Sequence, residues 1–290
     1  MTAICYKTTM QAALIFKHLH KHSILSGILF LLTALYCTDL LAQREFRVLQ
    51  SLEYDATEAL PDDYQVPGEF VVGRLMYPSG AQDYGWERGG TSWAVDYPRG
   101  DRTYARLLER LTTMDVRSVE QPVNLDDGDD IYNWPFLIVG MPRNWSLTDG
   151  QAAKLRDYLL RGGFLLADSF FGSREWSGFM RSLNRVFPDR QIVDLPDDHQ
   201  VFSIIYDLSG RTQVANMRQL SSRGVPYRGD GAVPQWRAIL DDAGRVMVAI
   251  SFNNDMGDAW QHQDNPRYPQ SAAKMGIEFG VNYAIYSITH

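Results

Sequence analysis

The sequence predicts an α/β protein built on a doubly wound, mostly parallel sheet, and two observations carry that prediction. Apolar runs too short for helices occur at 136–140 and 164–167, without the alternation of a half-exposed strand. Between them, apolar side chains from Ala152 to Leu159 fall on one helical face. Strand, helix and strand in this order imply a parallel pair with a right-handed crossover.

The stretch 162–169 organises the rest of the chain. Gly162 and Gly163 end the preceding helix, because glycine adopts the left-handed cap conformation without a Cβ clash. The apolar run that follows is a buried strand, and Asp168 comes where that strand ends. At the other end of the helix, Ser146 is the expected N-cap, with the acidic Asp149 three positions on.

The remaining elements follow from the same criteria. An antiparallel hairpin is expected near the C-terminus, because the turn residues 241–244 separate two apolar runs and end in a glycine. Strands are expected at 70–77, around 116–119 and at 191–195, with helices at 101–111, from about 176 to 187, and from 271 to about 286.

The first 42 residues have the form of a secretory signal peptide, cleaved after about Ala42. Three lysines precede an apolar segment at 24–36, and Ala42 provides the small residue that a signal peptidase needs before the cleaved bond. The alternative is an uncleaved anchor, but the apolar segment is shorter than the roughly 20 residues that cross a bilayer. Residues 43–67 are then a polar, irregular lead-in, and 68–290 form a single domain.

Cysteine and charge limit the functional classes. The two cysteines, Cys5 and Cys37, lie in the removed segment, so the mature chain has no thiol nucleophile and no disulfide. An exported protein without disulfides fits the bacterial periplasm. The chain of 290 residues carries a net charge of −7 and becomes more acidic after cleavage. That charge disfavours nucleic acid and anionic lipid as partners, which leaves a glycan or an envelope protein, with membrane contact only through an uncleaved N-terminal segment.

Polar side chains follow several of the apolar runs. Tyr77, Asp168, His199 and the group 253–258 all come directly after strand candidates. Parallel strands end at one edge of a sheet, where ligands of open α/β folds bind, so we expect these residues to line a common cleft. The alternatives are structural: aspartates after strands cap the next helix, and a single histidine is commonly hydrogen-bonded in the fold.

These residue types suggest particular chemistry. Asp168 and Asp255 could act as acid and base on a glycosidic bond, with His199 as proton donor or metal ligand. Six residues are expected to bind the ligand: Tyr77, Trp86, Trp93, Asn254, Asp258 and Trp260. The indole rings among them would stack on sugar rings. Interior packing is the alternative for the aromatic side chains.

The sequence contains no cofactor motif. Binding of a divalent metal ion is left as an alternative, because carboxylate and imidazole ligands suit several such ions. The spacing of the aspartates and histidines, however, matches no compact ligand motif. The acidic run 126–130 lacks the ordered alternation and the distal glutamate of an EF-hand, which indicates an exposed turn. Ser169 follows a strand but lacks the flanking glycines of a nucleophile elbow.

Several motifs together resemble one family of exported bacterial proteins. They are Arg74-Leu75-Met76-Tyr77, Trp134-Pro135-Phe136, Leu155-Arg156-Asp157-Tyr158-Leu159 with the stretch 162–168, Leu195-Pro196-Asp197-Asp198-His199, Asn253-Asn254-Asp255 with Trp260, and Gly280-Val281-Asn282-Tyr283. In this order they resemble the DUF4159 family. The resemblance implies a flavodoxin-like, class I glutamine amidotransferase-like fold, similar to domains linked to sugars. The amidotransferase cysteine is absent, and Asp168-Ser169 stands where many members carry two aspartates.

These observations lead to one functional hypothesis and two alternatives. The first is an exported module that binds a carbohydrate or cell-envelope ligand at the strand ends and has no amidotransferase activity. The first alternative is an envelope glycan hydrolase that uses Asp168, Asp255 and His199. The second is a scaffold in an envelope complex, with contacts made by the segments 79–100 and 211–234.

Overall fold

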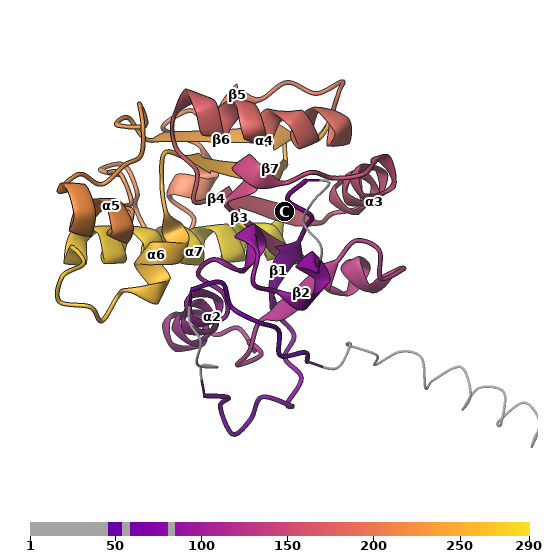
Figure 1. The fold of residues 1–290 in the computed structure, drawn as a ribbon, viewed down its shortest axis with the longest axis horizontal. Coiled ribbons are helices and arrows are strands. Elements are labelled where there is room, and N and C mark those ends of the chain that lie inside the picture. Colours follow the sequence, from indigo (N-terminus) through magenta and orange to yellow (C-terminus); the bar gives the residue numbers. More distant parts are fainter. Residues whose placement is uncertain (1–45, 54–58, 81–84) are drawn as a thin grey trace, which may run out of the picture. The chain divides into compact units, whose positions relative to one another are not determined.

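A seven-stranded sheet with the order β2-β1-β3-β4-β7-β6-β5 forms the centre of the fold (Figure 1). The computed structural model describes residues 46–53, 59–80 and 85–290, so the signal peptide expected at 1–42 lies outside the described residues. The described residues belong to one compact unit. Within the described ranges, no helix has the length and apolar character needed to cross a bilayer.

Five neighbouring strands of the sheet are parallel, and the last two pairings are antiparallel. The parallel part runs through β2, β1, β3, β4 and β7, while β6 pairs antiparallel with both β7 and β5. A mostly parallel sheet with an antiparallel hairpin near the C-terminus is therefore confirmed. The strands are β1 (Val72–Met76), β2 (Gln121–Asn124), β3 (Phe136–Gly140), β4 (Phe164–Asp168), β5 (Val193–Asp194), β6 (Gln235–Leu240) and β7 (Val246–Phe252).

Helices cover both faces of the sheet. Along β4, Leu165 and Ala167 pack into one apolar cluster together with α3 and α4, while Phe164 and Leu166 pack into another with α2, α6 and α7. Both faces of the parallel strands are thus buried, which explains their continuous apolar sequences. The helices are α2 (Arg99–Leu111), α3 (Asp149–Leu160), α4 (Gly172–Val186), α5 (Met217–Arg223), α6 (Met256–Gln261) and α7 (Gln270–Thr289).

Three local predictions were wrong. The strand expected around 116–119 lies at 121–124, where Gln121 and Asn124 are polar although buried, so apolar character did not reveal it. The N-cap of α3 is Thr148, whose hydroxyl accepts from the amide of Gln151 in a capping box, and not Ser146. The helix α6 directly follows the strand β7 and was not expected at all.

Candidate functional site

Four buried aspartates meet beyond the carboxyl ends of the parallel strands. Asp96 lies in the connection from β1 to α2, and Asp168 is the last residue of β4. Asp255 is the N-cap of α6 after β7, and Asp258 lies one turn later in that helix. The side chains of all four are buried. We call this group the carboxylate cluster; sheet topology brings Asp96 and Asp168 to Asp255 and Asp258, which are neighbours at the start of one helix.

The hydroxyl of Ser169 links the members of the cluster. It lies 2.7 Å from Oδ1 of Asp255, 3.0 Å from Oδ2 of Asp168 and 3.5 Å from Oδ2 of Asp96. A hydroxyl carries one proton, so Ser169 donates to only one carboxylate at a time. The remaining contacts of this oxygen are favourable only if another carboxyl is protonated or a cation is present.

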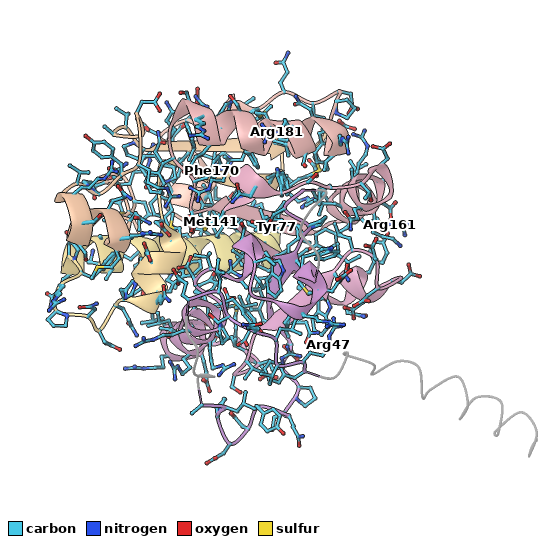
Figure 2. All side chains as sticks on the ribbon, in the orientation of Figure 1. Arg47, Tyr77, Met141, Arg161, Phe170 and Arg181 are labelled. Atoms are coloured by element: carbon cyan, nitrogen blue, oxygen red, sulfur yellow. The ribbon has the colours of Figure 1, made fainter. Side chains whose placement is uncertain are left out.

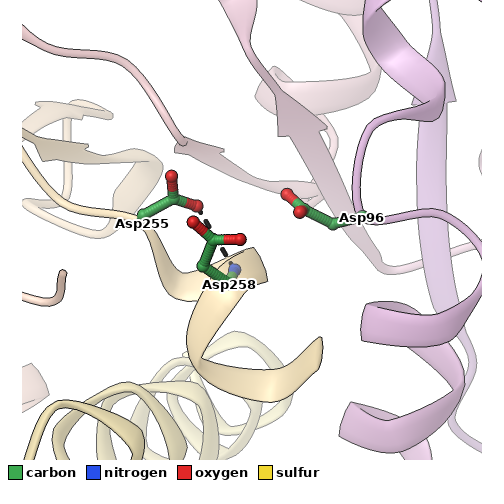
Figure 3. A group of neighbouring side chains, drawn as sticks. All are labelled: Asp96, Asp255 and Asp258. Atoms are coloured by element: carbon green, nitrogen blue, oxygen red, sulfur yellow. Dashed lines mark hydrogen bonds between the residues drawn. The ribbon is translucent and has the colours of Figure 1, made fainter. Parts of the chain in front are cut away.

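Asp96, Asp255 and Asp258 have the geometry of a small cation site (Figure 3). One carboxylate oxygen from each lies within 4.8 Å of the others. Figure 3 shows the Asp96 carboxylate pointing toward the other two from the opposite side of the gap. A Cβ on Gly257 would lie 2.2 Å from Oδ2 of Asp96, so glycine at this position allows the carboxylate to approach α6.

Asp96 is the least well satisfied of these carboxylates. Asp255 accepts hydrogen bonds from Ser169, Asn216 and its own helix, at 2.7, 2.7 and 3.3 Å. By contrast, the Asp96 carboxylate accepts a single long contact of 3.5 Å from Ser169 among the described residues. A buried carboxylate usually accepts several hydrogen bonds. The position of Asp96 therefore indicates that another electropositive group belongs beside it.

Positive side chains near the carboxylate cluster make their ion pairs elsewhere, although the charges of Arg74 and Arg228 also act on the cluster. Arg74 forms a two-pronged ion pair with Asp101 at 2.5 and 2.9 Å. Arg228 is paired with Glu175 and reaches only the backbone oxygen of Ser169. Within the described ranges, no lysine or arginine is within ion-pair distance of a cluster carboxylate, so the cluster has an excess of negative charge.

An exposed carboxylate marks the side from which the carboxylate cluster meets solvent. Oε2 of Glu53 accepts hydrogen bonds from the backbone amide of Asp96 at 3.3 Å and from Nε2 of Gln261 at 3.1 Å. Glu53 is exposed, and its charge raises the pKa of both Asp96 and Asp258. The negative potential of the cluster thus extends to the surface, where it would attract a cation.

Burial and mutual repulsion shift the acidity of the cluster. Burial, with the charge of Asp255 second, raises the pKa of Asp168 to about 7, against the opposing effect of amide hydrogen bonds from Met256 and Gly257. The same two causes, in the same order, raise the pKa of Asp96 and of Asp258 well above the ordinary value. The free cluster therefore holds protons that a bound cation would displace.

Backbone strain concentrates at the same edge of the sheet. Asp96, Ser169 and Asn253 have φ values of 63°, 64° and 62°, and Met141, directly after β3, has a φ of 47°. Non-glycine residues adopt the left-handed region at a cost of about 1 kcal/mol or more. Each of the four residues lies in a segment that follows a parallel strand. Such strain persists at functional sites where surrounding contacts fix the backbone.

The structure brings three of the sequence-predicted residues into one site: Asp168, Asp255 and Asp258. The capping alternative also applies to Asp255, which caps the next helix, whereas Asp168 bonds to the start of α6 and not to α4, the helix that follows it. Asp168 accepts from the amides of Met256 and Gly257 at 3.0 and 2.9 Å, and Asp255 accepts from the amide of Asp258. Helix capping and cluster formation are compatible here, because one carboxylate has several acceptor positions.

His199 lies far from the carboxylate cluster, contrary to the expectation of a shared edge. Its ring packs 5.9 Å from that of Tyr286, whose hydroxyl accepts a hydrogen bond from the amide of Val246 at the start of β7. Asp255 follows the end of the same strand, and a strand of seven residues spans about 20 Å. The chain turns back after β5 and returns His199 to the other end of the sheet, so it cannot act together with Asp168 or Asp255.

The predicted ligand-binding aromatic residues are part of the interior. Trp260 stacks on Tyr104 at 4.2 Å, and its indole nitrogen donates to Gly276. Trp93 donates to the carbonyl of Trp86, and both indoles belong to the apolar core. These contacts match the packing alternative, and the indoles offer no open face to a sugar ring.

Tyr77 and Asn254 also have structural contacts. The Tyr77 hydroxyl contacts the carbonyl oxygens of Gly140 and Met141 at 2.7 and 2.9 Å; Figure 2 marks Tyr77 and Met141 at the ends of their strands. The Asn254 side chain accepts from the amide of Val214 and donates to the carbonyl of Phe252. Both residues thus hold loops at the strand ends in place.

Sequence reasoning missed Asp96, Glu53 and the role of Ser169. Asp96 lies in a long connection, and only the position of that connection after a strand could have indicated it. Ser169 directly follows a strand and adopts the strained turn of φ 64° without flanking glycines, so the motif rule did not detect it. No sequence signal indicates Glu53.

The fold and the site define an α/β protein with an acidic site at the carboxyl edge of its sheet. The chain belongs to the DUF4159 family, described as a domain of unknown function, which matches residues 83–288. The family suggested by the sequence motifs is thereby confirmed. A comparison with curated proteins finds no match.

Proposed function

We propose that this chain binds a hard divalent cation, such as Ca²⁺ or Mg²⁺, through Asp96, Asp255 and Asp258. The observation that carries the proposal is the Asp96 carboxylate, which is buried, points at two other carboxylates and accepts one long hydrogen bond. Oxygen ligands and a high negative charge favour hard cations over copper or zinc. A Ca²⁺ ion lies about 2.3–2.6 Å from its ligands, so a single ion would reach oxygens up to 4.8 Å apart.

The ion would also be the contact point for the ligand of the protein. Three protein carboxylates leave coordination positions open on either ion, and hydroxyl or carboxylate oxygens fill such positions. A carbohydrate or another oxygen-rich envelope ligand would then bind through the cation, in place of the indole stacking expected from the sequence. We further propose that this binding takes place after export to the bacterial periplasm, in keeping with the N-terminal sequence.

The strand order supports a flavodoxin-like assignment, which we propose for the fold. Along the parallel strands the order β2-β1-β3-β4-β7 corresponds to the flavodoxin-like order 2-1-3-4-5. In that arrangement ligands bind at the carboxyl edge, near the point where the chain reverses direction across the sheet. Asp96 follows β1, the strand at this reversal.

Cation titration of the purified chain tests the proposal. After treatment with a chelator and its removal, calorimetric titration with CaCl₂ and MgCl₂ should show binding with proton release, because a cation displaces protons from the carboxyls with raised pKa. Asp96→Asn, which preserves shape, should weaken binding at least about tenfold. Asp264→Asn removes the same charge from an exposed position and should bind like the parent chain.

Three results would reject the cation proposal. One is the lack of measurable binding of either ion by the folded parent chain. Another is equal affinity in Asp96→Asn and Asp264→Asn, with thermal unfolding showing that both variants are folded. Binding that is lost only in Asp264→Asn would equally place the ion elsewhere.

One observation favours glycan hydrolysis as a second candidate function. Asp168, with a pKa of about 7, and Asp255 contact the same Ser169 hydroxyl, so a proton donor and a second carboxyl group lie side by side. His199 has no part in this version. Turnover of envelope glycans that survives in Asp168→Asn, a folded variant without the proton donor, would remove this candidate.

A further inference from the structure

A pocket of about 620 Å³ lies between η4 (Pro142–Asn144) and the first half of α4. Its volume is in the range of small-molecule sites. Figure 2 marks Arg181 on this helix, which covers the sheet face opposite α2, α6 and α7. The lining residues are Arg143, Asn144, Arg174, Glu175, Gly178 and Arg181. Such a polar lining does not suit an apolar ligand.

Helix geometry and a close backbone contact build this pocket. Arg174, Gly178 and Arg181 are four and three residues apart on α4, so they share one face of the helix. At the middle position a Cβ would lie 2.2 Å from the carbonyl oxygen of Arg143. Glycine therefore lets η4 touch the helix, and this contact sets the Arg143 side chain beside those of α4.

Positive charge in the pocket exceeds negative charge. Glu175 is the carboxylate of the lining, and it is already shared between Arg143, Arg228 and the backbone amide of Phe171. Among the described residues, Arg174 makes no ion pair, and Arg181 donates only to the carbonyl oxygen of Ser177. Guanidinium groups without a carboxylate partner thus face a pocket on a chain of net charge −7.

We infer that this pocket binds a phosphate-type oxyanion, either free or as the phosphate group of a small organic molecule. The planar fork of a guanidinium donates two hydrogen bonds to adjacent oxygens of such a group. A single fork satisfies one carboxylate, whereas a phosphate carries up to two negative charges on three or more acceptor oxygens and can serve several arginines. The inference does not depend on the cation proposal, because none of the lining residues belongs to the carboxylate cluster.

Titration with inorganic phosphate and pyrophosphate tests the inference. The experiment uses the full chain with a chelator present, so that a cation cannot contribute. Calorimetry and phosphorus NMR should show saturable binding that weakens with added NaCl. Arg174→Gln with Arg181→Gln should weaken binding at least about tenfold, since each lost guanidinium removes charge-assisted hydrogen bonds. The control is Arg106→Gln with Arg110→Gln, which removes two exposed arginines from α2.

The outcomes separate phosphate from other anions. The inference is supported if the two changes in α4 abolish phosphate binding while the two changes in α2 alter the phosphate affinity by no more than about twofold. No saturable phosphate binding, or equal loss in both pairs, overturns it. Citrate and sulfate serve as competing probes: tighter binding of citrate than of pyrophosphate would make the site a carboxylate site and overturn the phosphate assignment. Thermal unfolding of each variant verifies that the fold is retained.

Discussion

Without a cation, the chain should lose stability as the pH rises from about 4 to about 7. Asp168 has an ordinary pKa of 3.8 and a pKa of about 7 in the folded protein. A carboxyl whose pKa is raised by folding binds its proton more tightly in the folded state, so the stability it contributes is present in acid and is lost as the pH rises between these two values. The raised pKa of Asp96 and of Asp258 acts in the same direction.

The magnitude follows from the size of the shift. A rise of about three pKa units at about 1.4 kcal/mol per unit corresponds to roughly 4 kcal/mol between the two ends of this range. Asp168 is almost fully buried, so solvent screening does not reduce this figure. His199 and His262 have lowered pKa values and act in the opposite direction, losing stability as the pH falls, but they are equally present in every variant compared below.

Denaturant unfolding at a series of pH values, with a chelator present, measures the effect. Asp168→Asn should flatten the dependence of the unfolding free energy on pH, and the exposed Asp264→Asn should not. Addition of CaCl₂ or MgCl₂ should restore stability at the upper end of the range, because a bound cation takes the place of the protons. Parent and Asp168→Asn curves of equal slope, or a parent chain that gains stability across the range relative to Asp168→Asn, would refute the reasoning.

Further predictions concern the structure around the two sites. Gly178→Ala should destabilise the chain by about 1–3 kcal/mol in thermal or denaturant unfolding, because the added Cβ meets the Arg143 carbonyl oxygen at 2.2 Å. Gly150→Ala, whose Cβ would lie 4.0 Å from Oγ1 of Thr148 and would clash with no other element, is the control and should be neutral or stabilising. Thr148→Ala should cost about 1 kcal/mol through loss of the capping box of α3; no loss would contradict the capping assignment. His199→Ala should leave cation affinity unchanged in calorimetry, and a tenfold loss would contradict its placement away from the carboxylate cluster.

The fold could be predicted where sequence and burial agree. The strands β3 and β4 are continuous apolar runs because both of their faces are covered, and Gly162, with a φ of 113°, ends α3 as expected. The strand β2 was not predicted because two of its four buried residues, Gln121 and Asn124, are polar, so it does not form a continuous apolar run. The short helix α6 was missed because its six residues are too few to show a period.

The site was only partly predictable. Asp168 and Asp255 follow parallel strands, so topology alone predicts their meeting, and they do meet through Ser169. The same topological argument does not hold for His199, because β5 is short and the chain turns back after it. No local sequence pattern indicates such a reversal. Asp96 enters the cluster from a long connection, and its amide and carboxylate make contacts with residues distant in the sequence, Glu53 at 43 positions and Ser169 at 73. Contacts of this range arise from the whole fold and are not visible in a sequence window.

The position of β1 between two other strands has a practical consequence. The family match begins at residue 83, yet β1 ends at Met76 and lies in the sheet between β2 and β3. A fragment cut at the start of the match would lose the backbone partner of both neighbouring strands and would expose two unpaired strand edges to aggregation. Expression of this unit should therefore start before Glu53, so that the strand and the carboxylate beside Asp96 are both retained.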